Sequence, residues 1–314
     1  MVISKSKMPP VPKRKGRLWA SVKKNWVLYL FLLPTIVYVI LFNYAPLYGI
    51  QIAFRDFKGS LGIWGSPWVG MKHFSAFFNS YQFTDLLYNT LSLSLYQLVA
   101  TLPMPIVLAL LLNYTSWPWL KKLSQSSTFA PYLISVVVMA GMLIVFSGPT
   151  GLFNQITRLL GMEPVSFLGR EDLYQSMYVW SSVWQRTGYN AVIYIAALSS
   201  VNDELHEAAI IDGASKPKRI WHIDIPAIMP TMIILTIMAV GNLMGIGFEK
   251  SILLQNDLNL GRSEIISTYV YKVGIKGAQY SYATAIGIFN NVINFILLIT
   301  VNKLSKKVSG SGLW

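Results

Sequence analysis

Six long apolar runs, separated by polar stretches, dominate the pattern of this chain. They cover approximately residues 26–50, 86–112, 129–146, 176–198, 227–247 and 281–301. Each is close to the roughly 20 apolar residues that a helix needs to cross the hydrocarbon core of a bilayer. The first run is too long for a signal-peptide core and lacks a small-residue cleavage site, so we expect it to stay in place. The pattern predicts an all-α polytopic membrane protein with six transmembrane helices.

The polar stretches divide the chain into three parts. We expect a basic leader over residues 1–25, a transmembrane domain over 26–302 and a tail over 303–314. Within the domain, the segments 51–84, 148–175 and 248–280 are expected to be loops on one side, and 113–127 and 201–226 loops on the other. Within the loop 248–280, residues 265–273 are amphipathic and are expected to lie at the membrane interface.

Composition excludes several other classes of protein. Only 12% of the 314 residues are charged and 54% are hydrophobic, which is outside the usual range of soluble globular domains. The net charge of +13 lies largely in the leader and in short loops, so it gives no reason to expect a nucleic-acid partner. Without cysteine there is no disulfide and no thiolate metal site. The three histidines have no metal-ligand spacing, so we expect no metal site.

The distribution of Lys and Arg predicts the orientation. With the N-terminus inside, the leader, the loops 113–127 and 201–226, and the tail place 16 basic residues in the cytoplasm, whereas the longer outer loops hold 9. Cytoplasmic loops of membrane proteins carry the excess of basic residues. Both termini and the polar stretch 201–226 are therefore expected to be cytoplasmic.

This stretch, residues 201–226, predicts a compact elbow between two spans. Asn202 can cap a helix that opens with two acids, a favourable arrangement at the positive end of the helix dipole. Gly213 is suited to end that helix, because glycine adopts the left-handed conformation at no steric cost. Ser215 is expected to cap a second short helix, with Pro217 in its first turn. A polar elbow exposed in the cytoplasm is a candidate docking surface.

The spacing within the elbow carries a resemblance to a known family. Glu207, Ala208 and Ala209 are followed by Gly213 and, after nine further residues, by the sequence Ile-Asp-Ile-Pro ending at Pro226. This resembles the EAA loop of ABC importer permeases, although Ile225 stands where leucine is commoner. The resemblance implies the permease fold and assigns contact with a cytoplasmic ATPase to Glu207, Ala208, Ala209, Asp212, Gly213 and Ala214.

The resemblance also implies the partners. We find no phosphate-binding GxxxxGK[ST] sequence, so the chain is expected to be non-catalytic and to bind no cofactor, with ATP and Mg bound by two separate ATPase subunits. A second homologous permease and an extracytoplasmic, lipid-anchored sugar-binding protein are the other implied partners. The location implied is a bacterial cell membrane. The alternative class of protein is a secondary carrier or channel. This class is less favoured, because the elbow resembles a loop that contacts an ATPase.

Motifs along most of the chain are similar to one branch of this family, the oligosaccharide and polysaccharide permeases of Gram-positive bacteria. An oligosaccharide or polysaccharide fragment is therefore the expected substrate, and a peptide or amino acid is the alternative. The motifs are Asn25-Trp26, Leu33-Pro34, Tyr48-Gly49, Gly65 to Gly70, Asn89 to Leu91, Pro105 to Asn113, Tyr194 to Leu198, Thr268 to Tyr271 and Gly312 to Trp314.

Polar and aromatic residues inside two runs are candidates for the substrate path. Arg186 and Asn190 are one helical turn apart and share a face, and a charge inside a span is a candidate for function. Pairing with another helix is the structural alternative. A sugar needs polar groups beside aromatic rings. The candidates are Trp184, Arg186, Tyr189, Asn190, Asn290 and Asn294. The last two are equally suited to form hydrogen bonds between helices.

Overall fold

The computed structural model describes residues 23–310, 312 and 313. Within these ranges the chain forms helices and turns without strands, and its isolated bridges join Arg55 to Trp68 and Lys58 to Gly62. Most of the basic leader, together with Trp19 and Trp314, lies outside the described residues. Contacts between residues divide the chain into two units, 1–51 and 52–314.

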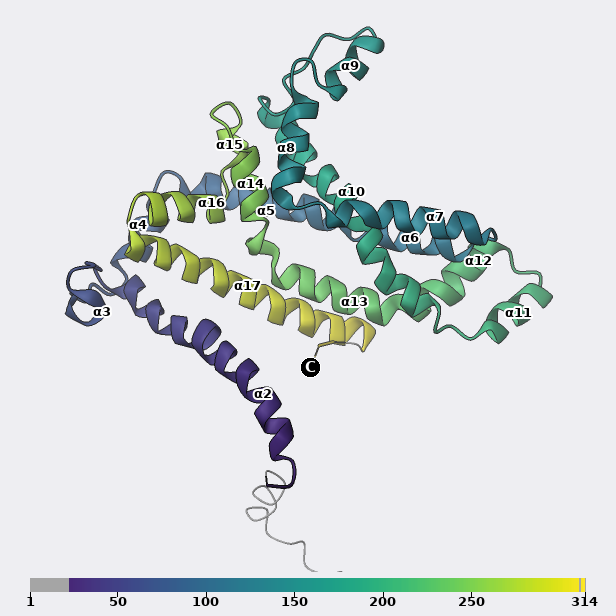
Figure 1. The fold of residues 1–314 in the computed structure, drawn as a ribbon, viewed down its shortest axis with the longest axis horizontal. Helices are drawn as coiled ribbons and strands as arrows, with labels where there is room; N and C mark the ends of the chain where they lie inside the picture. Colours follow the sequence, from purple (N-terminus) through teal and green to yellow (C-terminus); the bar gives the residue numbers. More distant parts are fainter. Residues whose placement is uncertain (1–22, 311, 314) are drawn as a thin grey trace, which may run out of the picture. The chain divides into compact units, whose positions relative to one another are not determined.

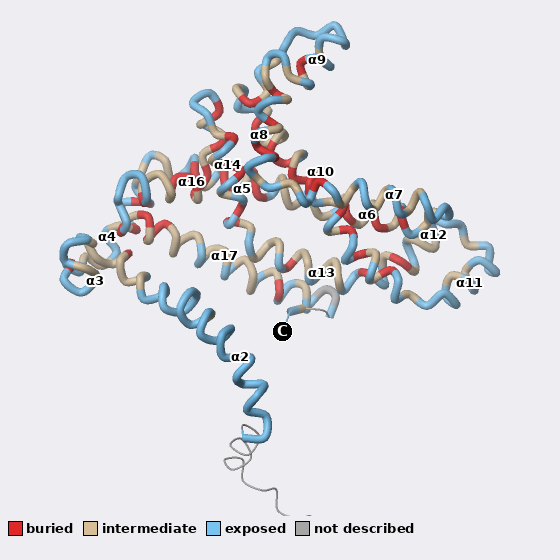
Figure 2. Tube along the Cα trace, in the orientation of Figure 1, coloured by how far each residue is buried: buried red, intermediate tan, exposed pale blue. Residues whose placement is uncertain are grey.

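The first unit consists mainly of one apolar helix. It begins with α2 (Trp26–Val39), continues through the π-helical η1 (Ile40–Tyr44) and passes into the 3-10 stretch η2 (Ala45–Phe54), whose last residues belong to the second unit. None of the residues of α2 is buried (Figure 2). A helix that is apolar on all sides suits a lipid or subunit environment, so the prediction of an apolar spanning helix here is confirmed.

The second unit is a set of helices of very different lengths (Figure 1). In chain order they are α3 (Gly62–Gly65), α4 (Lys72–Phe78), α5 (Phe83–Thr101), α6 (Pro103–Asn113), α7 (Pro118–Phe129), η3 (Ala130–Leu133), α8 (Val136–Ser147), α9 (Leu152–Leu159), α10 (Glu171–Leu198), α11 (Asp203–Ile211), α12 (Lys216–Arg219), η4 (Ile220–Asp224), α13 (Ile225–Gly241), η5 (Leu243–Gly245), α14 (Phe248–Leu254), α15 (Leu260–Ser263), α16 (Ile266–Tyr271), η6 (Lys272–Lys276) and α17 (Tyr280–Ser309).

Within the described residues, five helical stretches rather than six are long and apolar enough to cross a membrane. They are Trp26–Phe54, Phe83–Asn113, Val136–Leu159, Lys216–Gly241 and Tyr280–Lys307. The predicted span that is missing from these five is the fourth, 176–198, which corresponds to α10. This helix has 28 residues and a length of about 42 Å at 1.5 Å per residue. It is long enough, but its first turn holds two acids and its middle holds Arg186 and Asn190, which lower its hydropathy.

Helix α10 lies at the centre of the second unit, where it packs against α5, α6 and α7. Tyr174 and Tyr178 on α10 are buried together with Leu93 of α5 and Met139 of α8. At Gly188 a Cβ atom would lie 2.1 Å from the carbonyl oxygen of Thr128, far inside van der Waals contact. This glycine therefore permits α10 to approach the end of α7 closely. The neighbouring helices bury Gln185, whereas Arg186 stays exposed.

Two predicted loops turn out to contain packed helices. The segment 113–127 includes most of α7, and the loop 248–280 includes α14, α15 and α16. Residues 265–273 pack against protein, because Ile266, Thr268 and Tyr269 are buried. Their position at the membrane interface stays a prediction. The apolar side of α16 packs into a cluster with Phe77 and Ile286. An amphipathic pattern predicts that one face of a helix is covered, but it does not distinguish cover by protein from cover by membrane.

Candidate functional site

The first half of the elbow has the predicted local structure. The side chain of Asn202 accepts a hydrogen bond from the backbone N–H of Glu204 at 3.1 Å and so caps α11. At the other end Gly213 has a φ of +76°. The N–H of Ala214 donates to the carbonyl of Ala209 and that of Gly213 to the carbonyl of Ile210, which is the Schellman pattern of helix termination. Both capping predictions are confirmed.

The second half of the elbow differs from the prediction. Ser215 has extended backbone before α12 but its side chain makes no capping hydrogen bond. Moreover, α12 is not a separate short helix, because it continues through η4 into α13, so that Lys216–Gly241 forms one apolar helix. The elbow thus consists of one free helix, α11, followed directly by the start of a candidate span.

Helix α11 presents an exposed surface. None of its residues is buried, and three apolar side chains, Leu205, Ile210 and Ile211, are exposed. Glu207, Ala208, Asp212 and Gly213 are also exposed, whereas Ala209 and Ala214 are half-buried. An apolar patch rimmed by acids on a free helix is a surface suited to a protein partner, so the structure leaves the predicted coupling residues accessible.

A polar cavity of about 810 Å³ lies beside α10. The helices α5, α6, α8, α10, α13 and α14 and the turn η5 contribute to its wall. Arg186 and Asn190, both predicted from the sequence, line it. Among the described residues we find no hydrogen-bond or ion-pair partner for Arg186. Apart from the two tyrosines, Tyr178 and Tyr194, the polar lining residues are Ser94, Gln97, Thr101, Ser182, Gln185, Arg186, Asn190, Asn242, Glu249 and Lys250.

The cavity contains polar residues that the sequence analysis did not single out. The hydroxyl oxygen of Ser94 and the side-chain oxygen of Gln97 are buried without a hydrogen bond from any described residue. With Thr101 they lie at positions i, i+3 and i+7 of one helical face, a signal that could have been read from the sequence. All three residues line the cavity, so this polar face of α5 forms part of its wall.

Lys250 is a second cation of this cavity, but it is already bound. Its Nζ donates to the carbonyl of Tyr178 at 2.8 Å and to the hydroxyls of Ser181 and Ser182 at 2.7 Å each. These bonds join α14 to α10 and hold the lysine in place at the cavity wall. Arg186 is therefore the cation that is free to meet a solute.

The remaining path candidates lie elsewhere. Trp184 lines a separate apolar pocket of about 500 Å³ with Met139 and Phe146. Tyr189 stacks on Tyr132 with ring centroids 3.8 Å apart. The assignment of these two aromatic residues to the path stays a prediction that the cavity does not support.

The two asparagines of α17 bind backbone instead of facing the cavity. Asn294 accepts a hydrogen bond from the N–H of Met244 at 2.9 Å, and Asn290 donates to the carbonyl of the same residue at 3.1 Å. They hold the turn η5, which follows α13, against α17. The structure thus favours the second of the two roles considered for them, bonds between helices.

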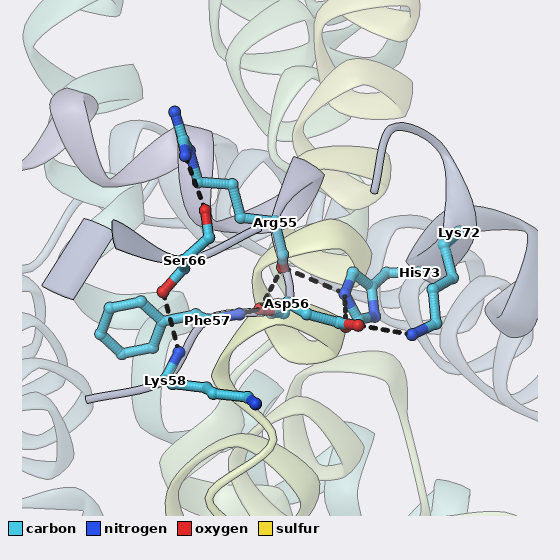
Figure 3. A network of polar contacts seen from close by, with 8 residues as sticks. Arg55, Asp56, Phe57, Lys58, Ser66, Lys72 and His73 are labelled. Carbon is cyan, nitrogen blue, oxygen red and sulfur yellow. Dashed lines mark hydrogen bonds and ion pairs between the residues drawn. The ribbon is translucent and has the colours of Figure 1, made fainter. Parts of the chain in front are cut away.

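A polar network joins residues 55–73 to the start of α17 (Figure 3). The hydroxyl of Ser281 donates to the carbonyl of Arg55 at 2.6 Å and accepts from the N–H of Phe57. Lys72 lies 2.6 Å from the carboxylate of Asp56 and His73 lies 3.2 Å from it. The hydrogen bond from Lys72 lowers the pKa of Asp56. This network stabilises the end of the unit opposite to the elbow.

Taken together, the helical fold, the exposed elbow and the cavity beside α10 indicate the class of protein: an integral membrane transport subunit. Residues 74–310 match the family described as "Binding-protein-dependent transport system inner membrane component". The chain belongs to this family, and the resemblance predicted from the elbow is confirmed. It is a non-catalytic permease subunit of an ABC importer, and ATP hydrolysis takes place on a separate subunit.

Curated relatives match over the whole chain. Protein LplB of Bacillus subtilis is 39% identical over 315 residues, covering 100% of this chain and 99% of that protein. The polygalacturonan/rhamnogalacturonan transport system permease protein YteP of Bacillus subtilis is 39% identical over 303 residues, covering 96% of this chain and 94% of that protein.

Two solved structures share the fold. A bacterial ABC transporter that imports the acidic polysaccharide alginate contains a chain with a TM-score of 0.87 and 36% identity, covering 93% of this chain and 99% of that one. The bacterial alginate transporter in complex with an alginate pentasaccharide-bound periplasmic protein gives a TM-score of 0.88 and 35% identity, covering 95% and 100%.

If the cavity is the substrate path, Arg186→Gln should lower uptake by about tenfold or more, because a hydrogen bond to a charged group contributes about 1.5–3 kcal/mol. Asn190→Ala should lower uptake with the complex intact, whereas Asn294→Ala should lower the yield of assembled complex by releasing Met244. Uptake and complex yield measured for all three variants test this. Wild-type uptake in the Arg186 and Asn190 variants would contradict the assignment.

Proposed function

We propose that this chain imports an oligosaccharide or polysaccharide fragment that an extracytoplasmic, lipid-anchored binding protein delivers. The observation that carries the proposal is the cavity lined by Arg186, Asn190 and polar side chains of α5. Sugars offer hydroxyls for such groups. One relative is named for transport of polygalacturonan or rhamnogalacturonan and another imports alginate, and both support the same substrate class.

The charge of the cavity favours fragments that carry carboxylates. The cavity wall holds two cations, Arg186 and Lys250, and one acid, Glu249. Because Lys250 is held by three protein oxygens, Arg186 is the group available to a carboxylate, with which a guanidinium forms strong paired hydrogen bonds. A neutral fragment still meets the polar lining but lacks this interaction.

The remaining subunits of the proposed importer follow from the family. Two ATPase subunits bind ATP and Mg and receive α11 in a groove, and a second homologous permease completes the path. When ATP closes the ATPase dimer, the movement of α11 turns the membrane subunits outward. The membrane lipid is expected to cover the apolar sides of the candidate spans.

In this proposal both termini and the elbow are cytoplasmic. The excess of basic residues in the segments assigned to the cytoplasm supports this orientation, as does the need for the elbow to meet a cytoplasmic ATPase.

The test of function uses the complex isolated from native membranes through a tag on this chain, together with its binding protein, in proteoliposomes. We expect ATP-dependent uptake of oligogalacturonides in preference to neutral oligosaccharides of equal length. Gly213→Val should abolish substrate-stimulated ATP hydrolysis, because a β-branched residue resists a φ of +76° at a cost of about 1–3 kcal/mol.

Gly213→Asn is the matched control, since asparagine tolerates the left-handed conformation, and it should retain most of the stimulation. Glu207→Ala should reduce the stimulation by removing an acid from the exposed docking surface. Normal stimulated hydrolysis in Gly213→Val, with the chain in the membrane at wild-type level, would contradict docking through the elbow.

The orientation is tested with reporter fusions. Reporters placed after Asn113, Gly213 and Ser309 should be cytoplasmic, and those after Gly65, Gly161 and Asn259 external, because either one candidate span or α10 separates each site from the next along the chain. An external reporter at Gly213 would overturn the orientation, since no cytoplasmic ATPase could then reach α11.

A further inference from the structure

A buried carboxylate lies at the base of the elbow. The side chain of Asp224 is fully buried, and the hydroxyl of Tyr114 donates to its Oδ2 at 2.6 Å. On the other side Nε2 of His206 lies 3.4 Å from Oδ1. Oδ1 has no hydrogen bond from any described residue. Asp224 therefore has one short hydrogen bond and one facing histidine.

These three residues belong to three different elements. Tyr114 follows the last turn of α6, His206 lies on α11, and Asp224 ends η4 where α13 begins. Because α11 buries none of its residues, it has little apolar packing of its own to hold it against the spans. A single carboxylate thus links the docking helix to the ends of two candidate spans.

The chemistry of the cluster makes this link firm. A carboxylate removed from water is costly unless it is paired and hydrogen-bonded, so its partners are held strongly. Burial and the hydrogen bond to Asp224 raise the pKa of Tyr114 to about 12, which keeps the phenol protonated as a donor. The guanidinium carbon of Arg219 lies 5.6 Å from the centre of the Tyr114 ring and adds positive charge nearby.

We propose that Asp224 is a positioning residue that carries the movement of the coupling helix into the spans. A displacement of α11 by the ATPase acts through His206 on Asp224, and from there on α13 directly and on α6 through Tyr114. The two spans then move together. This inference rests on the proposed function, because it assumes that an ATPase moves α11.

The test measures how many substrate molecules are imported per ATP hydrolysed by the isolated complex in proteoliposomes, with an oligogalacturonide and the binding protein. Asp224→Asn keeps an oxygen acceptor for Tyr114 but removes the charge that faces His206. His206→Gln keeps a polar side chain of similar length. Each should lower the transport-to-hydrolysis ratio by about tenfold, a value within the range found for contacting residues.

The double variant should be no worse than either single one, because both remove the same interaction. His222→Gln is the matched control. This histidine lies in η4, close to Asp224 in the sequence, but it is exposed and its Nδ1 lies 2.9 Å from the carbonyl oxygen of Lys218. It should leave the ratio unchanged.

A wild-type ratio in both single variants would overturn the proposal, and so would failure of His206→Gln to assemble, which would make the contact purely structural. Failure of the proposed function is seen separately, because the wild-type complex would then show no ATP-driven uptake at all.

Discussion

The arrangement of the second unit depends on one constraint, that a helix carrying charged and amide side chains must be kept out of contact with lipid. Helix α10 bears Gln185, Arg186 and Asn190 in its middle, and such groups are very costly in hydrocarbon. Its neighbours α5, α6 and α7 pack against it and bury Gln185, and Gly188 lets the end of α7 approach its backbone closely. Arg186 stays exposed within this chain, at the cavity. Lys250 of α14 donates hydrogen bonds to the backbone of α10 and to two serines of that helix. The cavity lies beside α10, and residues of α10 and of neighbouring helices form its wall.

The structure also shows how the elbow and the cavity are connected. Helix α13 starts directly after Asp224 and has 17 residues, which is about 25 Å at 1.5 Å per residue. It ends next to Asn242, which lines the cavity, and η5 beyond it is held by the two asparagines of α17. A movement at the elbow therefore reaches the cavity wall along one continuous helix, without a flexible segment between them.

Local features of this protein could be predicted from the sequence, because they depend on few neighbouring residues. The cap at Asn202, the left-handed Gly213 and the apolar spans are of this kind. The hydrogen bond between Tyr114 and Asp224 could not be predicted, since 110 residues separate them and nothing in either segment specifies the other. The different roles of Arg186, which lines the cavity, and Trp184, which does not, follow from the rotation of α10 against its neighbours. Helices α14 to α16 were missed because each is short and interrupted.

The central claim is that the cavity beside α10 is opened alternately to the two sides of the membrane by ATP. The chain has no cysteine, so Asn190→Cys provides a single thiol at the cavity wall, in a complex whose other subunits lack reactive thiols. We predict that a membrane-impermeant thiol reagent labels this position from outside only when the binding protein and a trapped ATP transition state are present, and from inside only without nucleotide. Labelling from the same side in both states would contradict the claim.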